Sequence, residues 1–132
     1  MRYLLDTNIL SSMLRSPEGD LTQRIRSLDD AVVFTSIIVA AEMRFGAVRK
    51  ASTNLTRRIV GLLESMMVEP IKAPAEEAYA MIRAHLERVG TPIGNNDIWI
   101  AAHALATDSI LVTDNVREFS RVPGLKIENW LR

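Results

Sequence analysis

The chain has 132 residues, 48% of them hydrophobic, and it carries 16 basic and 16 acidic side chains, so its formal net charge is zero. This length and composition predict one domain, residues 1–132, with an ordinary core. The balanced charge excludes a whole-protein field that attracts nucleic acid or an anionic membrane. The absence of cysteine excludes disulfides, thiolate metal sites and cysteine nucleophiles. No segment reads as a signal peptide or a membrane helix, so we expect a cytoplasmic protein with no membrane contact.

Continuous apolar runs alternate along the chain with helical patterns. In chain order, we predict a strand at 3–5, a helix at 20–28, a strand at 31–35, helices at 37–50 and 53–66, a strand at 67–69, helices at 75–89 and 96–106, and strands at 110–113 and 126–128. The strands lack polar alternation, as expected for strands covered on both faces. The alternation predicts an α/β fold, a three-layer α/β/α sandwich with a central parallel sheet.

Two predicted strands end in an aspartate. Asp6 follows the first strand, and Asp114 follows the strand at 110–113. Sites in open parallel sheets form beyond the carboxyl ends of the strands, so both carboxylates could face one crevice. Taken singly, each also fits a turn residue or a helix N-cap.

Glu42 lies beside the apolar stripe of its predicted helix, because Ile38 precedes it by four residues and Phe45 follows it by three. A carboxylate in that position needs a cation nearby, either a side chain or a metal. A salt bridge to Arg44 or Arg49, or a helix phase that turns Glu42 to solvent, remains open.

Asp97 falls in the first turn of the helix at 96–106, where a favourable interaction with the helix dipole would explain it alone. If Asp6, Glu42, Asp97 and Asp114 converge, their charges repel unless a divalent cation neutralises them. A site with oxygen ligands only favours Mg²⁺ or Mn²⁺, ions that serve phosphoryl chemistry.

The order and spacing of several segments resemble PIN-domain ribonucleases and, among them, the VapC toxins of toxin–antitoxin pairs. The resemblance covers essentially the whole chain, and its anchors are the segments 3–8, 41–46, 90–97, 111–115 and 117–119. It implies a PIN-like fold and a metal-dependent endoribonuclease that acts on tRNA or another structured RNA. It also implies a homodimer that a VapB-type antitoxin inhibits.

The resemblance further implies that Asp6, Glu42, Asp97 and Asp114 are the catalytic, metal-binding acids. Close relatives often have Asn-Asn where this chain has Asp114 and Asn115, which makes Asp114 the least secure ligand. We expect Thr7, Asn8 and Asn115 to support the site without binding the metal.

Basic residues that could contact RNA phosphates are Arg44, Arg49, Lys50 and Arg117, although the first three equally fit a solvated helical face. For His103, Trp99 and Trp130 we expect structural roles in packing.

Other functions are also compatible with parts of this pattern. A structure-specific DNA nuclease would use the same acids, and a non-catalytic PIN-like protein-binding module would not need them all. Receiver domains and haloacid-dehalogenase-like phosphatases also place an aspartate after the first strand. The latter need a second aspartate where this chain has Asn8, and receivers use adjacent acids that are missing here.

Overall fold

The computed structural model describes residues 1–132. In chain order its elements are β1 (Arg2–Leu5), α1 (Thr7–Arg15), α2 (Asp20–Arg26), β2 (Val32–Ser36), α3 (Ile37–Lys50), α4 (Thr53–Glu64), β3 (Met67–Glu69), α5 (Ala75–Arg88), α6 (Asn95–Ala106), β4 (Ile110–Val112), α7 (Val116–Phe119) and β5 (Ile127–Glu128). All five predicted strands and all five predicted helices are present, with ends that shift by one or two residues.

The five strands form one parallel sheet in the order β3-β2-β1-β4-β5, which confirms the predicted sheet. Leu4 of β1 pairs with Phe34 of β2 on one side and with Leu111 of β4 on the other, and all three side chains are fully buried. The chain proceeds from β1 to β2 and later returns to the opposite side of β1 as β4. The junction of β1 and β4 is therefore the topological switch point, where sites of open α/β sheets form.

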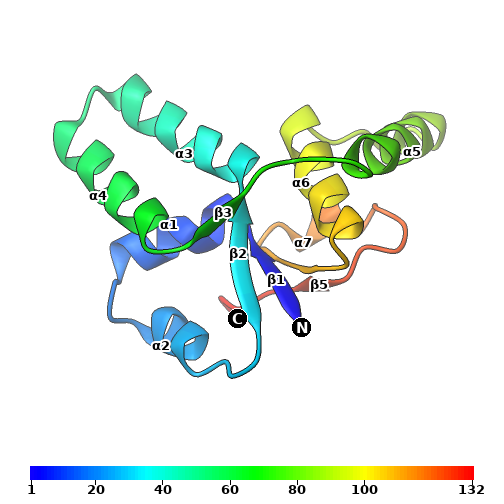
Figure 1. The fold of residues 1–132 in the computed structure, drawn as a ribbon. Coiled ribbons are helices and arrows are strands. Elements are labelled where there is room, and N and C mark those ends of the chain that lie inside the picture. Colours follow the sequence, from blue (N-terminus) through cyan, green and yellow to red (C-terminus); the bar gives the residue numbers. More distant parts are fainter.

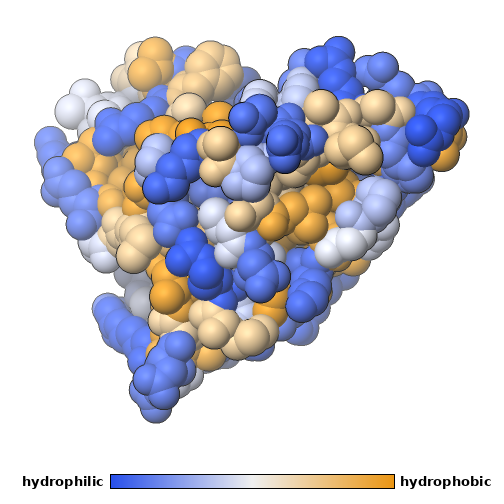
Figure 2. Space-filling model, turned by 45° about the vertical axis from the view of Figure 1, so that its right-hand side comes forward, coloured by the Kyte–Doolittle hydropathy of each residue, from blue (hydrophilic) through white to orange (hydrophobic).

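Helices cover both faces of the sheet, as predicted for a three-layer sandwich. Helices α1 to α4 lie on one side of the sheet and α5 and α6 on the other (Figure 1). α3 and α6 belong to opposite layers, yet they contact each other near the carboxyl ends of the strands. Seen from a different side, the molecule has two lobes with a notch between them (Figure 2). No helix is both long and apolar enough to cross a membrane.

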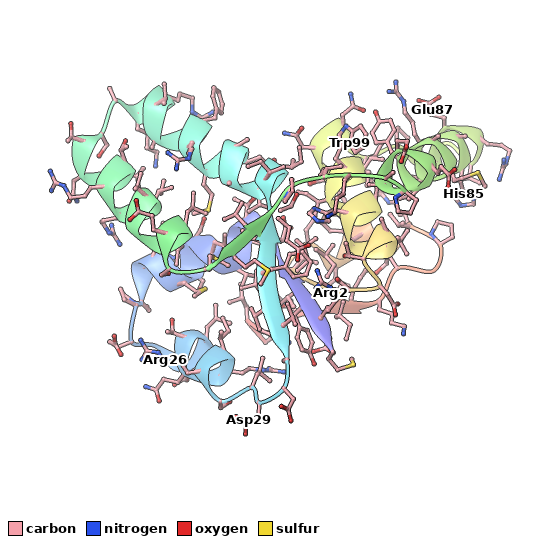
Figure 3. All side chains as sticks on the ribbon, in the orientation of Figure 1. Arg2, Arg26, Asp29, His85, Glu87 and Trp99 are labelled. Atoms are coloured by element: carbon pink, nitrogen blue, oxygen red, sulfur yellow. The ribbon has the colours of Figure 1, made fainter.

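The packing roles expected for the two tryptophans are confirmed. Trp130 is buried and packs against Tyr3, with 5.0 Å between the ring centroids. Trp99 lies between α6 and α5 (Figure 3), where it stacks on Tyr79 at 4.1 Å.

The sequence patterns did not predict α1 or α7. α1 begins directly after Asp6, whose carboxylate accepts a hydrogen bond from the Thr7 backbone N–H. Asp-Thr-Asn is typical of turns, but here the aspartate is a helix N-cap. Ile9 and Leu10 are fully buried on the inner face of α1. Their repetition four residues later as Met13 and Leu14 was the helical signal that the turn residues obscured.

Candidate active site

Asp6 is held rigidly where β1 ends. Its carboxylate accepts hydrogen bonds from the Thr7 backbone N–H at 2.8 Å and from the Thr113 hydroxyl at 2.8 Å. The Asn8 amide lies 3.5 Å from the same carboxylate. The residue is only 5% exposed, and burial raises the pKa of its carboxyl group despite these donors. The structure thus buries an acid at the switch point and fixes its orientation through the residues that follow β1 and β4.

Glu42 lies in α3 and is half-buried. It accepts a 2.8 Å hydrogen bond from the Thr7 hydroxyl, and the Asn96 amide approaches its other oxygen at 3.5 Å. No arginine or lysine forms a salt bridge with it, so the open alternative of a pair with Arg44 or Arg49 is wrong. Glu42 is therefore positioned by neutral donors that leave its charge without a cationic partner.

Asp97 is the acid most affected by its surroundings. It lies in the first turn of α6, and its pKa is raised to about 7, first by burial and then by the charges of Asp6, Glu42 and Glu118. When protonated, Asp97 also donates a hydrogen bond to Glu118, which raises its pKa further. Glu42 and Asp97 border one open hollow of about 400 Å³ that no hydrophobic residue lines. Acids 91 positions apart in the sequence therefore interact electrostatically at the carboxyl ends of the strands.

The structure does not bring Asp114 into this group. The Asn129 amide at 2.9 Å and the Arg132 guanidinium at 3.2 Å hold the Asp114 carboxylate, and both lower its pKa. In this structure the Asp114 carboxylate is held by these two residues, and its role as a fourth metal ligand stays a prediction. Its backbone N–H donates to the Asn8 side chain, so the residue still contributes to the framework of the site.

Glu118 is a further acid that acts on Asp97, and the sequence analysis missed it as a site residue. It lies in α7, and the Asn115 side chain donates a 3.0 Å hydrogen bond to its carboxylate. The available signal was its position six residues after the end of β4, at the same edge of the sheet. We call Asp6, Glu42, Asp97 and Glu118 the acidic cluster.

The donor set of the acidic cluster suits a hard divalent cation. Its ligands are carboxylate oxygens, the chain has no cysteine, and burial together with neighbouring acidic charges raises the pKa of Asp6 and of Asp97. In the arrangement of the structure, however, no three acid or histidine side chains lie close enough together to bind one ion. Thr7 and Thr113 each donate a hydrogen bond that fixes the direction of Glu42 and of Asp6, so binding of one ion requires the acids to move closer together.

The basic residues singled out in the sequence fall into two groups. Arg49 and Lys50 border a groove between α1, α3 and α4 that also reaches Glu42. Arg44 and Arg117 are exposed but do not border that groove.

His103 has the structural role that we expected. It is 2% exposed, its Nδ1 lies 2.9 Å from the Ser36 hydroxyl, and its Nε2 lies 3.6 Å from the Glu69 carboxylate. Burial lowers its pKa, so the imidazole is neutral inside the core.

Comparison with known proteins identifies the family. The model of the PIN domain matches residues 3–125. Ribonuclease VapC1 of Haemophilus influenzae strain R2866 is 34% identical, with complete coverage of both chains. The tRNA(fMet)-specific endonuclease VapC of Salmonella typhimurium is 31% identical, with 98% of each chain covered.

Solved structures agree with the sequence relatives. The Rickettsia felis VapBC2 complex bound to a promoter DNA fragment contains a chain that matches with a TM-score of 0.92 and 32% identity, over 98% of this chain and 99% of that one. The chain therefore belongs to the PIN-domain family and, within it, to the VapC group.

Proposed function

We propose that the protein is an endoribonuclease that uses Mg²⁺ or Mn²⁺ to hydrolyse phosphodiester bonds in tRNA or another structured RNA. The observation that carries the proposal is the convergence of Glu42, Asp97 and Asp6 from α3, α6 and the end of β1 at the carboxyl ends of the strands, where burial and neighbouring charges raise the pKa of Asp97 to about 7. A protein rarely keeps unpaired acids together without a chemical use for them. The names of the relatives, ribonuclease VapC1 and tRNA(fMet)-specific endonuclease VapC, support RNA as the substrate.

Asp6, Glu42 and Asp97 would hold the cation, with Glu118 as the nearest further acid. When bound, a divalent cation supplies Lewis-acid stabilisation of the phosphodiester and lowers the pKa of a water molecule. The protein's own residues hold the carboxylates that would bind the cation in fixed orientations. Thr7 and Asn96 orient Glu42, while Thr113 orients Asp6.

The protonation of Asp97 should make cation binding depend on pH. Because its pKa is about 7 in the metal-free protein, it carries a proton below neutrality and must lose that proton to become a charged ligand. Proton release should therefore accompany cation binding most clearly between pH 6 and pH 7.

We also propose that a short VapB-type antitoxin inhibits the protein in the cytoplasm. The solved relatives are VapBC complexes from Rickettsia felis, Haemophilus influenzae and Salmonella typhimurium, which supports such a partner. The homodimer that the family resemblance implies stays a prediction.

The test is cleavage by the purified protein, separated from any antitoxin, of total tRNA and of single-stranded and flapped DNA of matched length. We expect RNA cleavage with Mg²⁺ or Mn²⁺, none in excess EDTA, and none for Asp6→Ala or Asp97→Ala. Both variants should be checked for native circular dichroism. Full RNA cleavage in EDTA would exclude the metal mechanism, and cleavage of flapped DNA alone would favour the DNA nuclease. Folded protein that binds the antitoxin but cleaves nothing with either ion would favour the non-catalytic binding module.

A further inference from the structure

A groove of about 380 Å³ runs between α1, α3 and α4 and ends beside the acidic cluster. We call it the α1–α3–α4 groove. The residues that line it are Thr7, Ser11, Leu14, Arg15, Glu42, Met43, Gly46, Ala47, Arg49, Lys50, Leu55, Arg58 and Ile59. Thr7 and Glu42, which are joined by a hydrogen bond, form the end of the groove nearest the cluster.

The charge of the groove differs from that of the whole chain. The chain has equal numbers of basic and acidic residues, but the groove is lined by Arg15, Arg49, Lys50 and Arg58 against a single acid, Glu42. None of these four cations forms a salt bridge. Like charges gathered in one groove without partners favour an anionic occupant.

The four basic side chains differ in the contacts that they make with the rest of the protein. Arg58 donates a hydrogen bond to the backbone carbonyl of Leu14 and so also fastens α4 to the end of α1. The Arg49 guanidinium lies over the ring of Phe45, 5.4 Å from its centroid, and Arg15 and Lys50 are exposed. Arg15, Arg49 and Lys50 can therefore be replaced without loss of a hydrogen bond within the protein.

Hydrophobic side chains also line the groove. Five of its lining residues are hydrophobic, namely Leu14, Met43, Ala47, Leu55 and Ile59. A strand of nucleic acid matches both kinds of lining residue: its phosphates can contact the basic side chains, and its sugars and base faces can contact the hydrophobic ones. The groove is too small for a double helix, and single-stranded RNA is the form whose bases are free to enter such a site.

We propose that the α1–α3–α4 groove binds the single-stranded segment of RNA that adjoins the scissile bond, and that Arg15, Arg49 and Lys50 position its phosphates. The inference rests on the proposed function and adds the path of the substrate to it. The three residues touch no reacting atom, so they are positioning residues. Their loss should weaken binding and raise KM more than it lowers kcat.

The test compares Arg15→Ala/Arg49→Ala/Lys50→Ala with a control of equal charge change, Arg57→Ala/Lys72→Ala/Lys126→Ala. The control residues are exposed, form no salt bridge and do not line the groove. Binding of a short labelled single-stranded RNA is measured by anisotropy at several salt concentrations. All proteins carry Asp97→Asn so that no cleavage occurs, and KM and kcat are measured separately without that change.

Each phosphate contact adds about 0.7 to the slope of log K against log salt for a single strand. The groove variant should therefore lose about 2 from that slope and bind RNA about tenfold or more weakly at low salt. The control variant should keep both values close to those of the parent.

Unchanged affinity and slope in the groove variant would overturn the inference, and so would an equal loss in the control. A groove variant that binds RNA normally but no longer binds the antitoxin would assign the groove to the protein partner instead. If the parent protein cleaves no RNA at all, the proposed function fails. If it cleaves RNA and the groove variant matches it, only the inference about the groove fails.

Discussion

The Thr7 hydroxyl donates a 2.8 Å hydrogen bond to the Glu42 carboxylate and so joins the first residue of α1 to α3, across 35 positions of the chain. The backbone N–H of the same residue donates to Asp6. One threonine therefore orients two acids that come from different elements, and it does so with neutral donors that leave both charges available to a cation.

Replacement of Thr7 by valine tests that role. The variant keeps the shape of the side chain and the backbone bond to Asp6 but loses the donor to Glu42. We expect RNA cleavage to fall about 10–100-fold, as for other residues that orient metal ligands. The free energy of unfolding should fall by no more than about 1.5 kcal/mol. Thr7→Ser, which keeps the hydroxyl, should retain most of the activity, and equal activity in the valine variant would contradict the role.

The raised pKa of Asp97 predicts how stability depends on pH. Because the folded metal-free protein holds the Asp97 proton up to about pH 7 and the unfolded chain loses it near the ordinary pKa, the wild type loses stability as pH rises between these values. Asp97→Asn removes this loss. In EDTA at pH 8 the variant should be more stable than the wild type by roughly 1–3 kcal/mol, after allowance for solvent screening.

Urea unfolding of both proteins at several pH values measures that difference. The gap between variant and wild type should shrink toward pH 4, where the carboxyl group is protonated in both states. A wild type that is more stable than Asp97→Asn at pH 8 without metal would show that the Asp97 carboxylate stabilises the fold.

Glu118 and Asp114 can be compared directly as the fourth acid. We expect Glu118→Gln to weaken Mg²⁺ binding and cleavage at least tenfold, because Glu118 interacts with Asp97. Asp114→Asn changes a carboxylate that Asn129 and Arg132 already hold, so its effect should be several times smaller. Calorimetric titration with Mg²⁺ gives the affinity independently of cleavage. The opposite ranking would mean that Asp114 turns toward the cluster when the cation binds.

His103 provides a contrast, since its environment is structural. His103→Ala opens a cavity among Phe34, Ser36 and Glu69 and should lower the free energy of unfolding by about 2–4 kcal/mol. The kcat of the folded protein, measured well below its melting temperature, should stay near the wild-type value. A loss of kcat in fully folded protein would instead give the imidazole a part in the reaction.

The strands and longer helices could be predicted because each has a pattern contained in its own residues. The continuous apolar run at 110–112 is typical of a buried parallel strand wherever it lies in the fold. The same reasoning failed for α1, since its first residues favour turns and helix caps equally, and tertiary packing of Ile9 and Leu10 decides between them.

Some residues of the candidate site could likewise be predicted from the sequence, and others could not. Asp6, Glu42 and Asp97 stood out because each lies at a strand end, an apolar stripe or a helix start. Glu118 did not, because its position shortly after β4 is a weak signal and its effect on Asp97, a residue from another element, appears only in the folded chain. The orientation of Asp114 depends on Asn129 and Arg132, which the chain supplies only after β5.

The central place of β1 has a consequence for synthesis on the ribosome. β1 is synthesised before β4, with which it pairs on one side, and the Asp6 backbone N–H donates to the carbonyl of Val112. A nascent chain that stops short of β4 thus lacks one wall of the crevice around Asp6, so we expect it to be inert toward the RNA of its own translating ribosome. Nascent chains arrested on either side of β4 would measure when nuclease activity begins.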